Sequence, residues 1–137
     1  MSELNDWNAA VIAEFRANAG KVEQFGDAPL VILHTIGAKS GQRRENPLVA
    51  LLDGDQMFVF ASAAGAPKHP AWYHNLVATP EIDVEFGTET FRARLTPLED
   101  PARGERLAQQ ADLMPQFGEY VTSAAPRLIP VFEINRL

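Results

Sequence analysis

The first segment of the chain has an apolar residue at every third or fourth position, which is the spacing of one face of a helix. These positions are Leu4, Trp7, Val11, Ile12 and Phe15. Asn5 or Asp6 can cap such a helix at its start, and Gly20 can stop it. The pattern therefore predicts a helix within residues 1–20 whose apolar face packs against a core.

After residue 30 the pattern changes to short apolar or alternating runs separated by Gly, Pro and Asp, which is typical of strands and turns. The six predicted strands cover residues 30–36, 46–52, 56–62, 82–86, 91–95 and 128–134. Short helices are predicted at residues 67–77, after an initial loop, and at residues 100–113. We expect an α+β, mainly β fold: a six-stranded antiparallel barrel, closed or split, with flanking helices, because closure removes exposed strand edges.

Composition limits the classes of protein to consider. The 137 residues are 46% hydrophobic and 22% charged, so we expect one globular domain over residues 1–137. The net charge of −6 argues against a nucleic-acid binder, which needs an excess of cations, and against an acidic membrane surface as partner. No apolar stretch approaches the ~20 residues of a membrane span, and the first residues do not form a signal peptide. We expect a cytoplasmic protein with no stable membrane insertion.

Most familiar catalytic signatures are absent from the sequence. Without cysteine there is no disulfide and no thiolate nucleophile, and the signatures of phosphate-binding loops, serine hydrolases and zinc proteases are also missing. His34, His69 and His74 do not fall at a metal-ligand spacing on one helix face, so no metal site is expected. Chemistry must therefore come from a bound cofactor or from the few remaining polar groups.

Residues 37–44, with the sequence GAKSGQRR, form a predicted turn between two strands that suits an anion. Its glycines allow backbone N–H groups to converge on an oxyanion, Ser40 adds a donor, and Lys39 and Arg44 supply positive charge. The alternative is a solvated hairpin tip with no ligand.

Residues 63–76, with the sequence AAGAPKHPAWYHNL, combine small residues with aromatic and polar ones. Small residues let a flat ligand approach the backbone, Trp72 offers an apolar face, and Asn75 can donate and accept hydrogen bonds at a ring edge. This segment favours a site for a planar heterocycle. The alternative is that Trp72 belongs to the core and that His69 and His74 are surface or capping groups.

The two loops also carry a family resemblance. The pattern G-x-K-S-G-x-x-R over residues 37–44 is followed by Pro47 and then by GAPKHPAWYHNL over residues 65–76. This order resembles the deazaflavin-dependent nitroreductase family, whose donor is coenzyme F420, a reduced 8-hydroxy-5-deazaflavin. The match extends over residues 31–95 and returns at residues 127–131, so the N-terminal helix lies outside it.

The resemblance implies a split β-barrel of the FMN-binding type, with helix 1–20 outside a cofactor-binding barrel at residues 30–137. Its coenzyme site divides into two groups of residues. The phosphate and acidic tail would contact Lys39, Ser40, Gly41 and Arg44. The ring would contact Pro47, Phe60, Ala61, Ser62, Ala71, Trp72 and Asn75. Ala38 and Ala63 stand where relatives often carry a cation, so tail binding is expected to differ from theirs.

The implied reaction is hydride transfer from the coenzyme to an electron-poor small molecule, such as an enone or a nitro-heteroaromatic compound. A donor such as Ser62, Tyr120 or a backbone N–H would stabilise the negative charge that develops on the acceptor. Phe117 and Tyr120 lie in residues 115–121, which we expect to form a lid that contacts the substrate. Alternatively, both rings only pack the last helix onto the barrel.

Two other functions remain open at this stage. An ordinary FMN-binding split-barrel oxidoreductase would use the same cations for a terminal phosphate. A non-catalytic carrier would bind the coenzyme or another small molecule, consistent with the shortage of acid and base groups in the candidate pocket. The expected partners are small molecules in every case, and a homodimer is left open.

Overall fold

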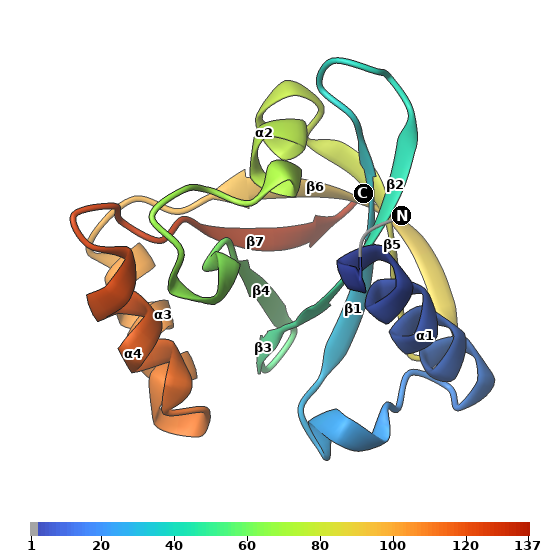
Figure 1. The fold of residues 1–137 in the computed structure, drawn as a ribbon, viewed down its shortest axis with the longest axis horizontal. Coiled ribbons are helices and arrows are strands. Elements are labelled where there is room, and N and C mark those ends of the chain that lie inside the picture. The colour runs from blue at the N-terminus through green and yellow to red at the C-terminus, as the bar shows by residue number, and fades with distance from the viewer. Residues whose placement is uncertain (1–2) are drawn as a thin grey trace.

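The structure, a computed structural model, describes residues 3–137, with side chains of the first helix described from residue 6 onward. Seven strands form one antiparallel sheet in the order β2-β1-β5-β6-β7-β4-β3, and this sheet curls into a half-barrel (Figure 1). The strands are β1 (Leu30–Ile36), β2 (Arg43–Val49), β3 (Leu51–Asp53), β4 (Gln56–Phe60), β5 (Glu81–Phe86), β6 (Glu89–Pro97) and β7 (Val131–Arg136). The predicted α+β class with an antiparallel sheet is confirmed.

Four α-helices and two short 3-10 helices flank the sheet in the described part of the chain. They are α1 (Glu3–Ala17), η1 (Glu23–Phe25), η2 (Ala63–Gly65), α2 (Ala71–Ala78), α3 (Ala102–Leu113) and α4 (Gln116–Ala124). Helix α1 packs at the β1–β2 end of the curled sheet, and the α3–α4 pair packs at the end that holds β4 and β7 (Figure 1). No helix of the described residues is long and apolar enough to cross a membrane.

The predicted count of six strands is wrong because the run at residues 46–52 is not one strand. Up to Val49 the chain pairs with β1, but the Ala50 N–H donates to the carbonyl of Pro29 at 2.9 Å, and Leu51 then pairs with Phe58 of β4. The chain thus leaves one edge of the sheet and joins the opposite edge. The apolar run on both sides of Ala50 conceals this change of partner.

The helix boundaries differ from the sequence prediction in two ways. Helix α1 begins at Glu3, so Asn5 and Asp6 lie inside it and do not cap it, while Leu4 has a side chain outside the described part. The predicted end at Gly20 lies three residues after the observed end at Ala17, and the Gly20 N–H donates to the carbonyl of Phe15 at 2.8 Å. Residues 115–121, for which no helix was predicted, form most of helix α4, and their expected role as a lid stays a prediction.

Three apolar clusters meet along β4 and β1. Residues alternate across β4, so that Val59 packs inside the curled sheet with α2, whereas Phe58 and Phe60 pack against α3 and α4. A third cluster joins α1 to β1 through residues such as Phe15 and Ile32. Helix α1 is therefore anchored on β1, whereas α3 and α4 are anchored on β4.

Candidate functional site

A cavity of about 370 Å³ lies between α1, η1, β2, the end of β4 and α4. It is lined by Trp7, Val11, Gln24, Phe25, Leu30, Pro47, Leu48, Val49, Phe60, Ser62, Ala64, Met114, Gln116, Phe117 and Tyr120. None of these side chains carries a charge at neutral pH, and most are apolar. The cavity therefore suits an uncharged, largely apolar molecule.

Five of the residues selected from the sequence line this cavity together. Pro47 comes from β2, Phe60 and Ser62 from the end of β4, and Phe117 and Tyr120 from α4. The Phe117 ring packs edge-on against Phe60 at 5.7 Å between centroids and against Tyr120 at 5.1 Å. Phe117 is buried, so it packs α4 onto the sheet as well as facing the cavity.

The N-terminal helix supplies a wall of the cavity that the sequence analysis did not assign. Trp7 of α1 and Phe25 of η1 line the cavity and meet edge-on at 6.1 Å between centroids. Trp7 remains 44% exposed, which is unusual for so large an apolar ring. The one sequence signal for this role was the Trp on the apolar face of α1, and a core position explained it equally well.

A tight turn brings Ser62 and Ala64 to the cavity wall. The turn continues through Gly65, whose φ of +80° is left-handed. A Cβ at this position would lie 2.0 Å from the Ser123 hydroxyl oxygen and 3.0 Å from the Tyr120 Cα. The Ser123 hydroxyl also donates to the Gly65 carbonyl at 2.9 Å, so the turn is packed directly on α4.

Residues 37–44, here called the cationic loop, are mostly solvent-exposed and contribute no residue to this cavity. Lys39 and Arg44 form no ion pair with any side chain that the structure describes. The Ser40 hydroxyl accepts a hydrogen bond from the Gln42 N–H at 3.1 Å, within its own turn, and Gly41 follows with a φ of +70°. A second hollow, of about 620 Å³, extends from Arg44 to α1.

Asn75 joins the cationic loop to α2. Its amide oxygen accepts from the Ala38 N–H at 2.9 Å, and its amide nitrogen donates to the Thr35 hydroxyl at 3.3 Å. The two segments that the sequence analysis treated separately are thus hydrogen-bonded to each other.

The other predicted ring contacts do not line the 370 Å³ cavity. Trp72 is 7% exposed and packs in the main core at 6.3 Å from the Phe132 ring. Ala61 is fully buried in the same core, and Ala71 is exposed at the start of α2. Contact of these residues with a coenzyme ring stays a prediction.

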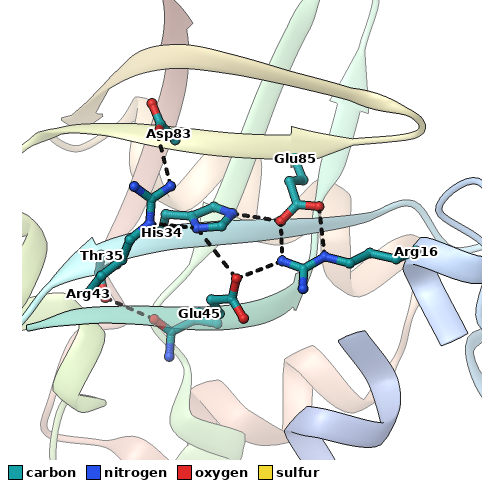
Figure 2. A network of polar contacts seen from close by, with 8 residues as sticks. Arg16, His34, Thr35, Arg43, Glu45, Asp83 and Glu85 are labelled. Atoms are coloured by element: carbon teal, nitrogen blue, oxygen red, sulfur yellow. Dashed lines mark hydrogen bonds and ion pairs between the residues drawn. The ribbon is translucent and has the colours of Figure 1, made fainter. Parts of the chain in front are cut away.

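A polar network fastens α1 to the sheet (Figure 2). Arg16 of α1 donates to Glu85 of β5 at 2.7 Å and to Glu45 of β2 at 2.6 Å, and Glu85 also accepts from His34 at 2.6 Å. The hydrogen bond from Arg16 is the main reason that the pKa of Glu85 lies below its usual value. The opposite ring nitrogen of His34, Nδ1, accepts from Nε of Arg43 at 3.0 Å, so His34 joins Arg43 of β2 to Glu85 of β5.

The same network brings His34, Glu45 and Glu85 within 4.8 Å of one another, a grouping that the sequence spacing did not reveal. Arg16 forms an ion pair with both carboxylates and offsets part of their negative charge. The cluster therefore acts here as an ion-paired attachment for the helix that carries Trp7.

A curled antiparallel sheet of this kind, flanked by helices, is a split-barrel-like fold. The sequence profile of the F420H2-dependent quinone reductase matches residues 7–135, which is nearly the whole described chain. The chain belongs to this family.

Individual relatives agree with this assignment. An F420H2-dependent quinone reductase of Mycobacterium tuberculosis is 39% identical over 89 residues, which are 64% of this chain and 60% of that protein. The matched segment thus spans less than two thirds of that relative. A solved F420-H2 dependent reductase superposes with a TM-score of 0.70 at 35% identity, covering 78% of this chain and 94% of the other.

A second solved chain, described as a domain-swapped dimer, is 32% identical with a TM-score of 0.72 and covers 97% of this chain and 100% of the other. The resemblance to the F420-dependent family inferred from the two loops is confirmed.

Proposed function

We propose that the protein is an oxidoreductase that uses reduced coenzyme F420 to reduce a flat, uncharged acceptor of the quinone class. The observation that carries this proposal is the 370 Å³ cavity, which has apolar walls, no charged lining residue, and the hydroxyls of Ser62 and Tyr120. A quinone offers a flat apolar ring and two carbonyl oxygens that accept hydrogen bonds. An anionic substrate would lose its hydration in this cavity without gaining a compensating charge.

The cationic loop fits the anionic part of the coenzyme. Lys39 and Arg44 are exposed and free of ion pairs with the described side chains, so both charges are available to a phosphate or an acidic tail, and Arg44 also lines the 620 Å³ hollow. Asn75 holds this loop against α2 through the Ala38 N–H, which gives the cations a defined position. We propose that Ser40 and Gly41 contribute donors to the same anion, as the resemblance implies.

When bound, the coenzyme supplies two electrons as a hydride, and the protein supplies position and electrostatics. Pro47 and Phe60 offer apolar surface to a flat ring at the cavity floor. We propose that the Tyr120 hydroxyl, with Ser62 as the second donor, hydrogen-bonds the acceptor oxygen on which negative charge develops. An acceptor that fills the cavity would displace water from it, which would strengthen that hydrogen bond.

Turnover with defined donors tests the proposal. We expect the purified protein to oxidise reduced coenzyme F420 only when menadione, a simple quinone, is present. Turnover with reduced FMN in place of reduced coenzyme F420 would favour the ordinary flavin alternative. Tight coenzyme binding without turnover on a panel of quinones, enones and nitro compounds would favour the carrier.

Replacing Tyr120→Phe is expected to lower kcat for menadione by about 10- to 100-fold, which is less than the roughly 100- to 1000-fold typical of one lost oxyanion-hole donor, because Ser62 remains. Coenzyme affinity should stay unchanged, since Tyr120 lies away from the cationic loop. Steady-state kinetics and coenzyme titration measure the two effects. Tyr73→Phe is the matched control, because Tyr73 lies on α2 and does not line the cavity. Parental kcat in Tyr120→Phe would mean that its ring only packs α4.

Replacing Lys39→Ala or Arg44→Ala is expected to weaken coenzyme binding by about 1–3 kcal/mol, the range for a lost charged hydrogen bond. The melting temperature should hardly change, because both side chains are exposed. Lys21→Ala serves as the control, because Lys21 is an exposed cation that lines neither the 620 Å³ hollow nor the 370 Å³ cavity. Unchanged coenzyme affinity at low ionic strength in both loop variants would contradict the assignment.

We also propose a homodimer in the cytoplasm as the working form. The support for a dimer is the solved relative described as a domain-swapped dimer. Light scattering on the purified protein distinguishes one chain of 15.1 kDa from two.

A further inference from the structure

We propose that Arg127 is a positioning residue, which fixes the turn carrying Ser62 and Ala64 and so aligns the acceptor between that turn and Tyr120. This inference rests on the proposed function for its effect on turnover. Arg127 itself does not line the cavity. It follows α4 in the chain and precedes β7.

The guanidinium group of Arg127 contacts both ends of the turn. It donates to the carbonyls of Ala61 at 3.0 Å and Ser62 at 2.8 Å, which precede η2, and to the carbonyl of Ala66 at 2.8 and 3.1 Å, which follows it. A further contact of 3.0 Å joins it to Nδ1 of His69. All three guanidinium nitrogens are used, so this one side chain closes the turn.

The turn needs such support because of its backbone. Ala63 and Ala64 have φ values of +49° and +53°, in the left-handed region that alanine rarely adopts. Such conformations persist only where surrounding contacts enforce them. The amide hydrogen bonds inside the turn, from Gly65 to Ser62 at 2.9 Å and from Ala66 to Ala63 at 3.0 Å, depend on the same conformation.

The hydrogen-bond acceptors around Arg127 require the several N–H donors of a planar guanidinium group and not only its positive charge. They are three carbonyls and one imidazole nitrogen, and Arg127 has no carboxylate partner among the described side chains. Burial, with Arg127 and His74 nearby, lowers the pKa of His69, so its ring is neutral and accepts through Nδ1. A lysine would keep the charge at a single atom and could not reach both ends of the turn.

The test compares Arg127→Lys with Arg103→Lys in the full chain. Arg103 is a matched control, because it also donates to a backbone carbonyl, that of Ile129 at 3.0 Å, but contacts neither the turn nor the cavity. Four measurements are made on each: amide hydrogen exchange of residues 65 and 66, menadione binding by quenching of tryptophan fluorescence, coenzyme affinity, and kcat with menadione.

We expect Arg127→Lys to speed amide exchange in the turn and to lower kcat by about tenfold or more, as a misaligned reaction does, with coenzyme affinity unchanged. Arg103→Lys should match the parent in amide exchange of the turn and in kcat. Parental kcat in Arg127→Lys would overturn the proposal, as would an equal loss in Arg103→Lys or parental exchange in the turn. If the parent itself does not reduce menadione, the proposed function fails. The positioning role is then judged separately: unchanged amide exchange in the turn and unchanged menadione affinity in Arg127→Lys would overturn it.

Discussion

Replacing Gly65→Ala is expected to destabilise the protein by about 2–5 kcal/mol, because it combines a left-handed alanine with overpacking. The new methyl group would meet the Ser123 hydroxyl oxygen at 2.0 Å and the Tyr120 Cα at 3.0 Å, and the second of these is backbone that cannot rotate away. Either the turn or α4 must shift. Chemical denaturation of the variant and the parent measures the loss in free energy of unfolding.

Gly54→Ala separates the two contributions to this loss. Gly54 has a φ of +60° but no atom within 4 Å of an added Cβ, so it carries the backbone cost alone, about 1–2 kcal/mol. Adding Ser123→Ala to Gly65→Ala should recover part of the stability, because it removes the closest atom. If Gly65→Ala costs no more than Gly54→Ala, the packing of the turn on α4 is not as described.

Replacing Trp72→Ala is expected to cost about 3–5 kcal/mol of stability, the range for a buried aromatic side chain. Trp72 is 7% exposed and packs against Phe132 inside the curled sheet. Coenzyme affinity should fall as well, because α2 also carries Asn75, which holds the cationic loop through Ala38. Thermal melting and coenzyme titration well below the melting temperature measure the two effects.

Val77→Ala is the control for this variant, since Val77 lies on the same helix but is 64% exposed, and a change of less than about 0.5 kcal/mol is expected. If Trp72→Ala leaves no folded protein, Trp72→Phe keeps an apolar ring and allows the coenzyme titration. A Trp72→Ala variant as stable as the parent would show that the ring is not part of the core.

The sequence pattern located most strands because alternation reports directly which residues are buried. The predicted strand at residues 30–36 coincides with β1, and the alternating runs at residues 82–86 and 91–95 lie within β5 and β6. The prediction of a single strand at residues 46–52 was wrong for the same reason, because the pattern reports burial and not the strand that each residue pairs with. Burial continues on both sides of Ala50, and only the hydrogen-bond partner changes.

Helix α4 was missed because its segment is short and contains Gly118 and Thr122, both poor helix formers. Its apolar side includes the buried Phe117 and Ala124, but two positions are too few to separate a helix from a loop that packs. Contact with the sheet and with η2 stabilises the helix, and neither contact is visible along the chain.

The sequence by itself determined the fold class, the family and the cationic character of residues 37–44, because each depends on residues close together in the chain. Only the tertiary structure decided which of these residues meet. It joined Pro47, Phe60, Ser62, Phe117 and Tyr120 in one cavity, added Trp7 from a helix outside the motifs, and used Arg127 to hold a turn some sixty positions earlier. Such contacts follow from strand order and side-chain direction in space, and a residue's type and spacing do not specify them.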